Sequence, residues 1–213
     1  MAKTVADVMK MVQENEVKFV DFRFTDTRGK QHHTTVPVSH FDEEKFASGH
    51  AFDGSSIAGW KGIEASDMQL IPDPASANID PFFEETTLIM TCDVIEPSDG
   101  KAYDRDPRSI AKRAEAYLKA SGLGDTAYFG PEPEFFIFDG VRWSNEPGKV
   151  FFEIEEYEAP WNSGTKFESG NRGHRPTTKG GYFPVPPVDS TQDMRAEMVL
   201  ILEQLGIPVE VFH

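Results

Sequence analysis

The sequence predicts an α+β protein in which helices and strands of mixed order build two domains. Three observations lead to this fold class. Apolar residues recur at helical spacing in three segments, they alternate with polar residues in the strand expected after residue 17, and Gly and Pro residues separate these segments. The chain of 213 residues has the length of one large domain or two small ones.

The first hundred residues predict a small domain around a long loop. A capped helix, two strands joined by a turn, and a buried strand are expected at residues 5–12, 17–24, 31–38 and 86–95. Thr4 and Asp7 have the spacing of a capping box before the helix. The stretch 40–81 is rich in Gly and Pro and predicts a long loop. Long ordered loops in compact proteins are more often functional than idle.

A turn cluster at residues 97–100 predicts a domain boundary near residue 103, which gives domains 1–103 and 104–213. A helix is expected directly after the boundary, with Asp106 as its N-cap and Pro107 at its first position. Gly122 ends that helix.

The second domain also predicts a helix capped by Ser190 and a strand over residues 209–212. Each helix of this domain has an apolar stripe that we expect to be buried. The stripes are Ile110, Ala114, Tyr117 and Leu118 in the first helix, and Met194, Met198, Ile201, Leu202 and Leu205 in the second. No turn, polar tail or closing element follows the last strand in the sequence.

The composition excludes several classes of protein. A net charge of −15 would repel a polyanion, which disfavours nucleic acid as a partner. The single cysteine, Cys92, excludes an internal disulfide and fits a reducing compartment. No stretch approaches the roughly 20 apolar residues of a membrane span, and the first residues lack the apolar core of a secretion signal. We therefore expect a cytoplasmic protein with no membrane partner.

The segment 130–138 carries a carboxylate pair and predicts a buried strand. Because side chains alternate along a strand, Glu132 and Glu134 would point the same way, about 6.6 Å apart. Each could hold a divalent cation, and hard oxygen ligands suit Mg²⁺ or Mn²⁺ bound to a phosphate-bearing substrate. Alternatively, both glutamates lie at the solvated start of a strand and bind nothing.

Two loops contain residues that could carry chemistry. Asp53 is followed by Gly-Ser-Ser and could accept hydrogen bonds from a small cation or remove a proton, but Asp-Gly is also a common turn. The loop 180–187 could bring Tyr182 to the edge of a site, or could be an irregular connection with one buried aromatic.

The segment 158–182 has a positive net charge, opposite to that of the whole chain. Its basic residues are Lys166, Arg172, Arg175 and Lys179. It could meet phosphate or an acidic partner surface, or be an exposed polar loop. His174 has no spaced His, Cys or Glu companion, so we do not expect it to bind zinc. The sequence also lacks a P-loop and a dinucleotide-binding glycine motif, so a nucleotide would have to be bound in another way.

Six segments taken together, in this order and spacing, resemble bacterial type I glutamine synthetase. They are residues 53–60, 103–108, 130–136, 171–176, 179–187 and 209–213. The resemblance runs from about residue 17 to the last residue. It implies a small β-grasp-like domain over 1–103 that carries the Asp-Gly-Ser-Ser loop. It also implies that 104–213 is the first part of a catalytic domain built on a curved antiparallel sheet with flanking helices.

The resemblance implies an ATP-dependent ligase of nitrogen metabolism, which phosphorylates L-glutamate on its γ-carboxylate and then replaces phosphate by ammonia to give glutamine. Two anions meet in the first step, so divalent metals must neutralise charge. In this family Glu132 and Glu134 would each serve a different Mg²⁺ or Mn²⁺, with two or more metals per active site. Glu210 would lie at the site of the co-substrate ATP.

The resemblance also implies an ammonium pocket. Asp53 would attract ammonium and take its proton, with Ser56 and Tyr182 completing the negative cage. Family members assemble as dodecamers of two stacked hexameric rings with active sites between subunits, so Asp53 and Glu132 need not be close within one chain. The segment 166–175 resembles the one that projects toward the central channel, which favours a structural role for it.

Two alternatives to this function stay open. One is a related ligase that joins glutamate to an amine other than ammonia. The other is a shortened, non-catalytic module for oligomerisation or regulation. The family's further metal ligands and its substrate-binding arginines would follow residue 213, so we expect these 213 residues alone not to synthesise glutamine.

Overall fold

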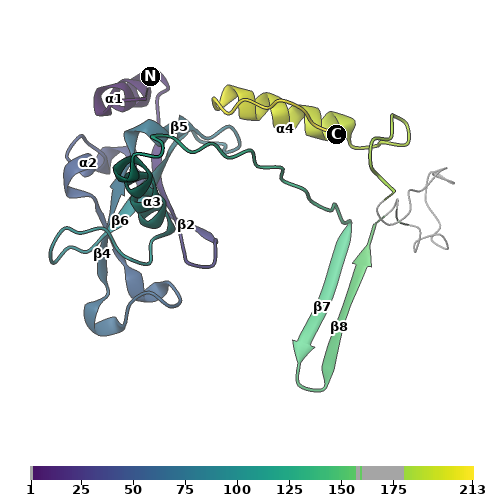
Figure 1. The fold of residues 1–213 in the computed structure, drawn as a ribbon, viewed down its shortest axis with the longest axis horizontal. Helices are drawn as coiled ribbons and strands as arrows, with labels where there is room; N and C mark the ends of the chain where they lie inside the picture. Colours follow the sequence, from purple (N-terminus) through teal and green to yellow (C-terminus); the bar gives the residue numbers. More distant parts are fainter. Residues whose placement is uncertain (1, 157–158, 160–179) are drawn as a thin grey trace. The chain divides into compact units, whose positions relative to one another are not determined.

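The computed structural model describes residues 2–156, 159 and 180–213. The chain forms two compact units, Met1–Phe129 and Gly130–His213. The first contains a sheet with three helices, and the second contains a hairpin and one helix (Figure 1). The sequence predicts the domain boundary near residue 103 from a turn cluster, and these two compact units do not test it. That boundary stays a prediction.

The sheet of the first unit has six strands. They are β1 (Phe19–Thr25), β2 (Gln31–Pro37), β3 (His50–Asp53), β4 (Asp67–Pro72), β5 (Asn78–Ile79) and β6 (Thr87–Ile95). Five of them follow the order β2-β1-β6-β4-β3, and β5 pairs with β6. Strands β1 and β6 are parallel, while the other pairs are antiparallel. The strands expected at 17–24, 31–38 and 86–95 are therefore confirmed.

Three α-helices accompany the sheet, α1 (Val5–Glu14), α2 (Lys45–Ser48) and α3 (Pro107–Ser121). Short 3₁₀ turns lie at Val38–His40, Gly54–Ser56, Ile63–Ala65 and Pro74–Ser76. The predicted N-caps of α1 and α3 and the predicted end of α3 are confirmed. Thr4 and Asp7 form a reciprocal capping box, Asp106 caps the amides of Arg108 and Ser109, and Gly122 ends α3 in the left-handed conformation.

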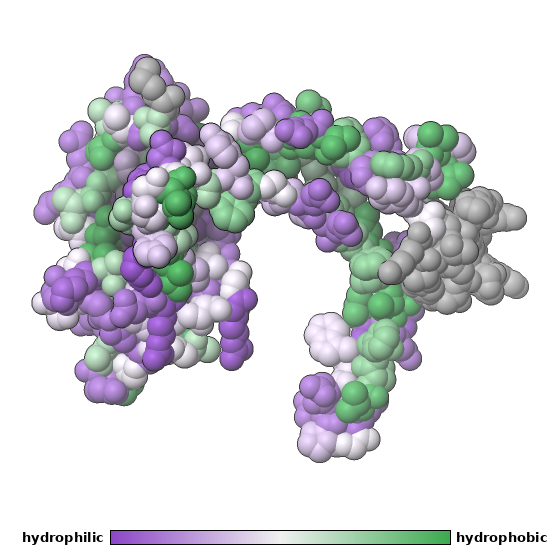
Figure 2. Space-filling model, in the orientation of Figure 1, coloured by the Kyte–Doolittle hydropathy of each residue, from purple (hydrophilic) through white to green (hydrophobic). Residues whose placement is uncertain are grey.

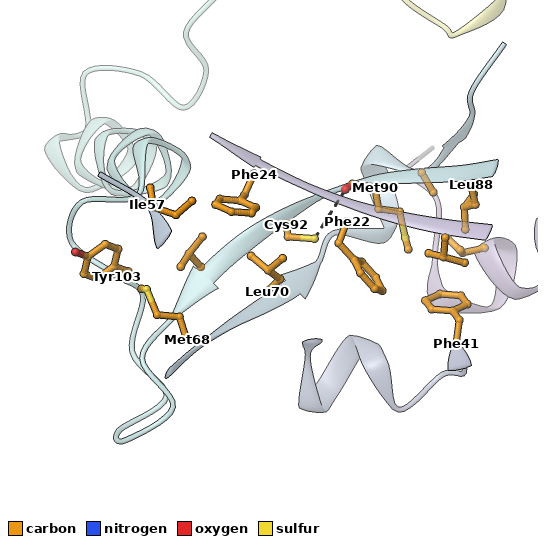
Figure 3. Close-up of a cluster of buried hydrophobic side chains, with 14 of the residues drawn as sticks. Phe22, Phe24, Phe41, Ile57, Met68, Leu70, Leu88, Met90, Cys92 and Tyr103 are labelled. Atoms are coloured by element: carbon orange, nitrogen blue, oxygen red, sulfur yellow. Dashed lines mark hydrogen bonds between the residues drawn. The ribbon is translucent and has the colours of Figure 1, made fainter. Parts of the chain in front are cut away.

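One face of this sheet carries the hydrophobic core (Figure 3). Phe22 on β1, Leu70 on β4 and Leu88 on β6 are fully buried. The alternation in the sequence predicts this for Phe22. The expectation of a long loop over 40–81 is wrong, because α2, β3, β4 and β5 lie in this stretch. Apolar surface of this kind contributes roughly 25 cal/mol per Å² removed from water. Cys92 is free and buried in the same layer, and burial raises the pKa of its thiol.

The opposite face of β1 carries a buried charge. Asp21 has no exposed surface and accepts hydrogen bonds from Thr35 (2.6 Å), His33 (2.6 Å) and Arg23 (2.8 Å). Arg23 also donates to Asp80 at 2.9 Å. Burial by itself would raise the pKa of Asp21, but the hydrogen bonds outweigh it and lower that pKa.

Helix α3 meets the sheet through its polar side. Arg108 pairs with Asp73 and Asp93, and Lys112 also pairs with Asp93. The expected burial of the apolar stripe of α3 is therefore wrong in this structure. Ile110 is 50% exposed and Tyr117 is 78% exposed, because the ion-paired side of the helix faces the sheet.

The second unit contains the antiparallel hairpin β7 (Gly140–Glu146) and β8 (Lys149–Glu155), and the helix α4 (Gln192–Gln204). The helix follows Thr191 rather than Ser190, and Thr191 makes no capping hydrogen bond through its side chain. Hydrophobic side chains lie at the surface along the hairpin (Figure 2). Trp143 and Phe152, which pair across the strands, are 72% and 74% exposed.

Besides the cap at Ser190, three expectations for the second unit are wrong in the described residues. Residues 130–138 and 209–212 join no sheet there. A strand buried on both faces needs neighbours along both edges, and β7 and β8 pair with each other. The stripe of α4 is also not fully buried, since Met198 is 43% exposed. No helix in the described part of the chain is long and apolar enough to cross a membrane.

Candidate functional site

The Asp53 carboxylate lies at the point where β3 ends and a 3₁₀ turn begins. Its Oδ1 accepts hydrogen bonds from the amide of Ser55 at 2.8 Å and from the hydroxyl of Ser55 at 2.6 Å. The hydroxyl of Ser56 is 3.5 Å from Oδ2. The Ser55 hydroxyl, followed by the Ser55 amide, lowers the pKa of Asp53 below its usual range. This exposed carboxylate therefore stays negative at neutral pH.

Packing at Gly54 fixes the start of this loop. The amide of Gly54 donates to the carbonyl of Ser66 at 2.7 Å, which ties the loop to the beginning of β4. A Cβ atom at position 54 would lie 2.3 Å from the sulfur of Met68, which is fully buried. A larger residue here would displace the buried side chain of Met68, so the packing favours glycine at this position.

Two apolar residues of the same loop enter the core. Ile57 is 7% exposed and Trp60 is 5% exposed. The Trp60 ring packs against Phe24 and Phe52, with ring centroids 5.6 Å and 6.3 Å away. The loop is therefore anchored at both ends, while Asp53 stays at the surface.

Glu132 and Glu134 lie in an exposed, unpaired segment of the second unit. Neither carboxylate makes a hydrogen bond or ion pair with the described residues. Two free carboxylates separated by one residue have the donor chemistry that Mg²⁺ or Mn²⁺ prefers. Within the described ranges no three His, Cys, Asp or Glu side chains gather closely enough to hold a metal, so the metal role of Glu132 and Glu134 stays a prediction.

The structure brings the Tyr182 loop and the last residues of the chain together. The rings of Tyr182 and His213 meet edge to face at 5.0 Å, and Phe183 lies 4.3 Å from the same histidine ring. Glu210 lies three residues before His213 and is exposed, as is Tyr182. Two candidate residues thus come from neighbouring segments of the second unit, whereas Asp53 and Ser56 belong to the first.

Two family models match the chain. The model described as the glutamine synthetase beta-Grasp domain matches residues 16–97, and the one described as the glutamine synthetase catalytic domain matches residues 104–213. The chain belongs to the glutamine synthetase family.

Curated relatives cover the chain over almost its whole length. The glutamine synthetase of Escherichia coli (strain K12) is 57% identical over 206 residues, which are 97% of this chain and 44% of that protein. The 3-hydroxylaminophenol mutase of Cupriavidus pinatubonensis (strain JMP 134 / LMG 1197) is 73% identical over 213 residues, which are 100% of this chain and 45% of that protein. The chain thus spans less than half the length of these relatives.

A solved glutamine synthetase from Plasmodium falciparum shares the fold. Its TM-score with this structure is 0.83 at 22% identity, and the match covers 99% of this chain and 42% of that one. The predicted fold class, a β-grasp domain followed by part of a glutamine synthetase catalytic domain, is confirmed by this match and by the family models.

Several candidates lie beyond what the structure describes or were missed from the sequence. Lys166, Arg172, His174 and the rest of the basic segment up to Lys179 fall outside the described residues. The segment 103–108 contributes to the family resemblance and leads to the cap of a helix, but neither pattern assigns a role to Tyr103 or Arg105. Their contacts with the Asp53 loop depend on tertiary packing that a local pattern does not encode.

Proposed function

We propose that the protein to which this chain belongs is a glutamine synthetase that joins ammonium to L-glutamate at the expense of ATP, a step of nitrogen metabolism. The observation that carries the proposal is the Asp53 loop. It presents an exposed carboxylate of lowered pKa beside two serine hydroxyls. The identity of 57% to a glutamine synthetase over nearly the whole chain supports the same reaction.

The two oxygens of Asp53 suit two different tasks. Oδ1 is held by the amide and hydroxyl of Ser55, which fixes the carboxylate plane. Oδ2 has a long contact to the hydroxyl of Ser56, at 3.5 Å, and could receive a cation at the surface. The negative carboxylate attracts ammonium and accepts one of its protons at Oδ2. The resulting ammonia would attack the carbonyl carbon of γ-glutamyl phosphate, and the C–O bond to phosphate would break as the C–N bond forms. Tyr182 would add its phenol oxygen to this pocket.

The carboxylates of the second unit would serve the phosphoryl transfer. Glu132 and Glu134 are exposed and can each ligate a divalent cation, Mg²⁺ or Mn²⁺. When bound, such ions neutralise the charge between ATP and the γ-carboxylate of glutamate. Glu210 would contact ATP, and its neighbour His213 packs on the Tyr182 loop.

Assembly and location are part of the same proposal. Family members form stacked hexameric rings, and an active site shared between subunits would join Asp53 of one copy to Glu132 and Glu134 of the next. The protein would act in the cytoplasm, where its substrates occur. The 213 residues alone would not make glutamine, because they match only 44% of the glutamine synthetase of Escherichia coli, and the remaining metal and substrate ligands would lie in the rest of the protein.

A second candidate function rests on one specific observation. The relative that is 73% identical is named 3-hydroxylaminophenol mutase. The protein would then also rearrange 3-hydroxylaminophenol, or do so in place of glutamine synthesis. This identity is higher than that to the glutamine synthetase of Escherichia coli.

Both candidates are tested with the full-length protein and its Asp53→Asn variant. We expect glutamine to form from glutamate, ammonium, ATP and Mg²⁺, and the variant to lose at least about 100-fold of this rate. Ser98→Ala, at an exposed position in a turn, is the matched control and should keep the wild-type rate. Rearrangement of 3-hydroxylaminophenol without any glutamine formation would contradict the ligase and favour the mutase.

A further inference from the structure

The short segment that precedes α3 is fixed to the sheet at both of its ends. The amide of Tyr103 donates to the carbonyl of Val94 on β6 at 2.8 Å. Asp106, which is 1% exposed, accepts the amide of Val94 at 3.4 Å and caps α3. Tyr103 is itself 6% exposed. The backbone between residues 103 and 106 therefore has a defined position relative to β6.

Two side chains of this segment hold the carbonyl groups near the end of the Asp53 loop. The hydroxyl of Tyr103 donates to the carbonyl oxygen of Trp60 at 3.0 Å. The guanidinium of Arg105 donates to the carbonyl of Gly59, and its Nη1 also lies 3.4 Å from the carbonyl of Trp60. The Tyr103 ring meets the Trp60 indole edge to face at 5.2 Å.

These contacts matter because Trp60 is not held through its own indole nitrogen. Its buried Nε1 has no hydrogen-bond partner among the described residues. The amide of Trp60 donates to the carbonyl of Ile57 at 3.1 Å, and the amide of Ile57 donates to Gly54 at 3.2 Å. Two successive turns thus connect the carbonyl held by Tyr103 to the residue that follows Asp53.

We propose that Tyr103 and Arg105 are positioning residues for the ammonium pocket. By holding the carbonyl groups of Gly59 and Trp60, they fix the loop that presents Asp53 to its substrate. The position of a reacting group governs rate steeply, since a misplacement of about 1 Å can cost about 100-fold. The inference rests on the proposed function, because it assigns these two residues to the same pocket.

The test uses the full-length protein with Tyr103→Phe, Arg105→Gln and Arg105→Lys. Tyr103→Phe removes one hydroxyl and keeps the ring that packs on Trp60. Arg105→Lys keeps the charge and can still reach one carbonyl group. Lys101→Gln is the matched control, because Lys101 is exposed, lies two residues from Tyr103 and pairs with Asp99.

The first readout is hydrogen exchange at residues 54–60, which needs no activity. We expect exchange in this segment to become about fivefold faster in Tyr103→Phe and in Arg105→Gln, which corresponds to the loss of one hydrogen bond. Lys101→Gln should exchange as the wild type does. Unchanged exchange in both variants would overturn the proposal.

The second readout is steady-state kinetics of glutamine formation. The KM for ammonium should rise about tenfold in Tyr103→Phe and Arg105→Gln, with the KM for ATP unchanged, and Arg105→Lys should recover part of the loss. A merely structural role would lower the active fraction and leave the ammonium KM unchanged, which would overturn the proposal. If the wild type formed no glutamine, the proposed function would fail. Faster exchange in the variants would then still show that Tyr103 and Arg105 hold the Asp53 loop in place.

Discussion

The two units of the chain differ in the solvent exposure of their aromatic side chains. In the first unit, Phe22 is fully buried between strands and Trp60 is nearly so. In the second, Trp143 and Phe152 face each other across the hairpin and are both more than 70% exposed. A domain is stable when its elements bury their apolar faces against one another. The first unit meets this condition within the described residues, and the second does not.

The largest expected effect is the difference in stability between a substitution in the core of the first unit and one on the hairpin of the second. Phe22→Ala should lower the free energy of unfolding by about 3–5 kcal/mol, because it leaves a cavity in a packed core. Phe152→Ala removes the same side chain from an exposed position and should change it by less than about 0.5 kcal/mol. Urea denaturation of the 213-residue chain measures both. If both variants lost the same free energy of unfolding, the hairpin would pack as tightly as the core. That result would contradict the difference between the two units.

Next in size is the buried charge of the first unit. Asp21→Asn should cost about 2 kcal/mol, because the carboxylate accepts three hydrogen bonds with no exposed surface. The matched variant Glu153→Gln breaks the pair with Arg142, which lies at an exposed position of the hairpin. That variant should leave the urea midpoint unchanged.

The same carboxylate predicts a pH dependence. The folded-state pKa of Asp21 is lowered, so the stabilisation is present above its ordinary pKa of about 4 and is lost as pH falls through the lowered value. The difference in urea midpoint between wild type and Asp21→Asn should therefore shrink below about pH 4. A difference that stays constant from pH 7 to pH 3 would contradict this account of Asp21.

The smallest effect compares the starts of two helices. Asp106→Ala should destabilise by about 1–2 kcal/mol, because Asp106 accepts the amides of Arg108 and Ser109 at the start of α3. Thr191 precedes α4 without a capping hydrogen bond from its side chain, so Thr191→Ala should cost less than about 0.5 kcal/mol. Thermal unfolding compares the two variants, and a larger loss for Thr191→Ala would reverse the expectation.

The sequence predicted the first unit better than the second. Local patterns were sufficient for the capping box at Thr4, for the alternation around Phe22 and for the helix that starts after Asp106. They failed for residues 130–138 and 209–212, since an apolar run predicts a strand but does not supply the neighbouring strands that would pair with it. The buried network around Asp21 could not be predicted either, because its partners come from different strands.

The candidate site was predictable to a similar extent. The Asp-Gly-Ser-Ser pattern placed Asp53 on an exposed loop, and the structure adds that Ser55, rather than Ser56, holds the carboxylate most closely. The role inferred for Tyr103 and Arg105 required tertiary contacts 43 to 46 residues apart in sequence. Residue type and spacing predict which groups can react, whereas packing decides which residues hold them in position.

Our central proposal is that Asp53 of one copy and Glu132 of the next contribute to the same active site. It is tested most directly by mixing two inactive full-length variants, Asp53→Asn and Glu132→Gln, after dissociation and reassembly. An intact site needs a native loop from one copy and a native glutamate from the next, so about one quarter of the wild-type rate of glutamine formation should return. No activity above that of the separate variants, in oligomers shown to contain both, would contradict the claim.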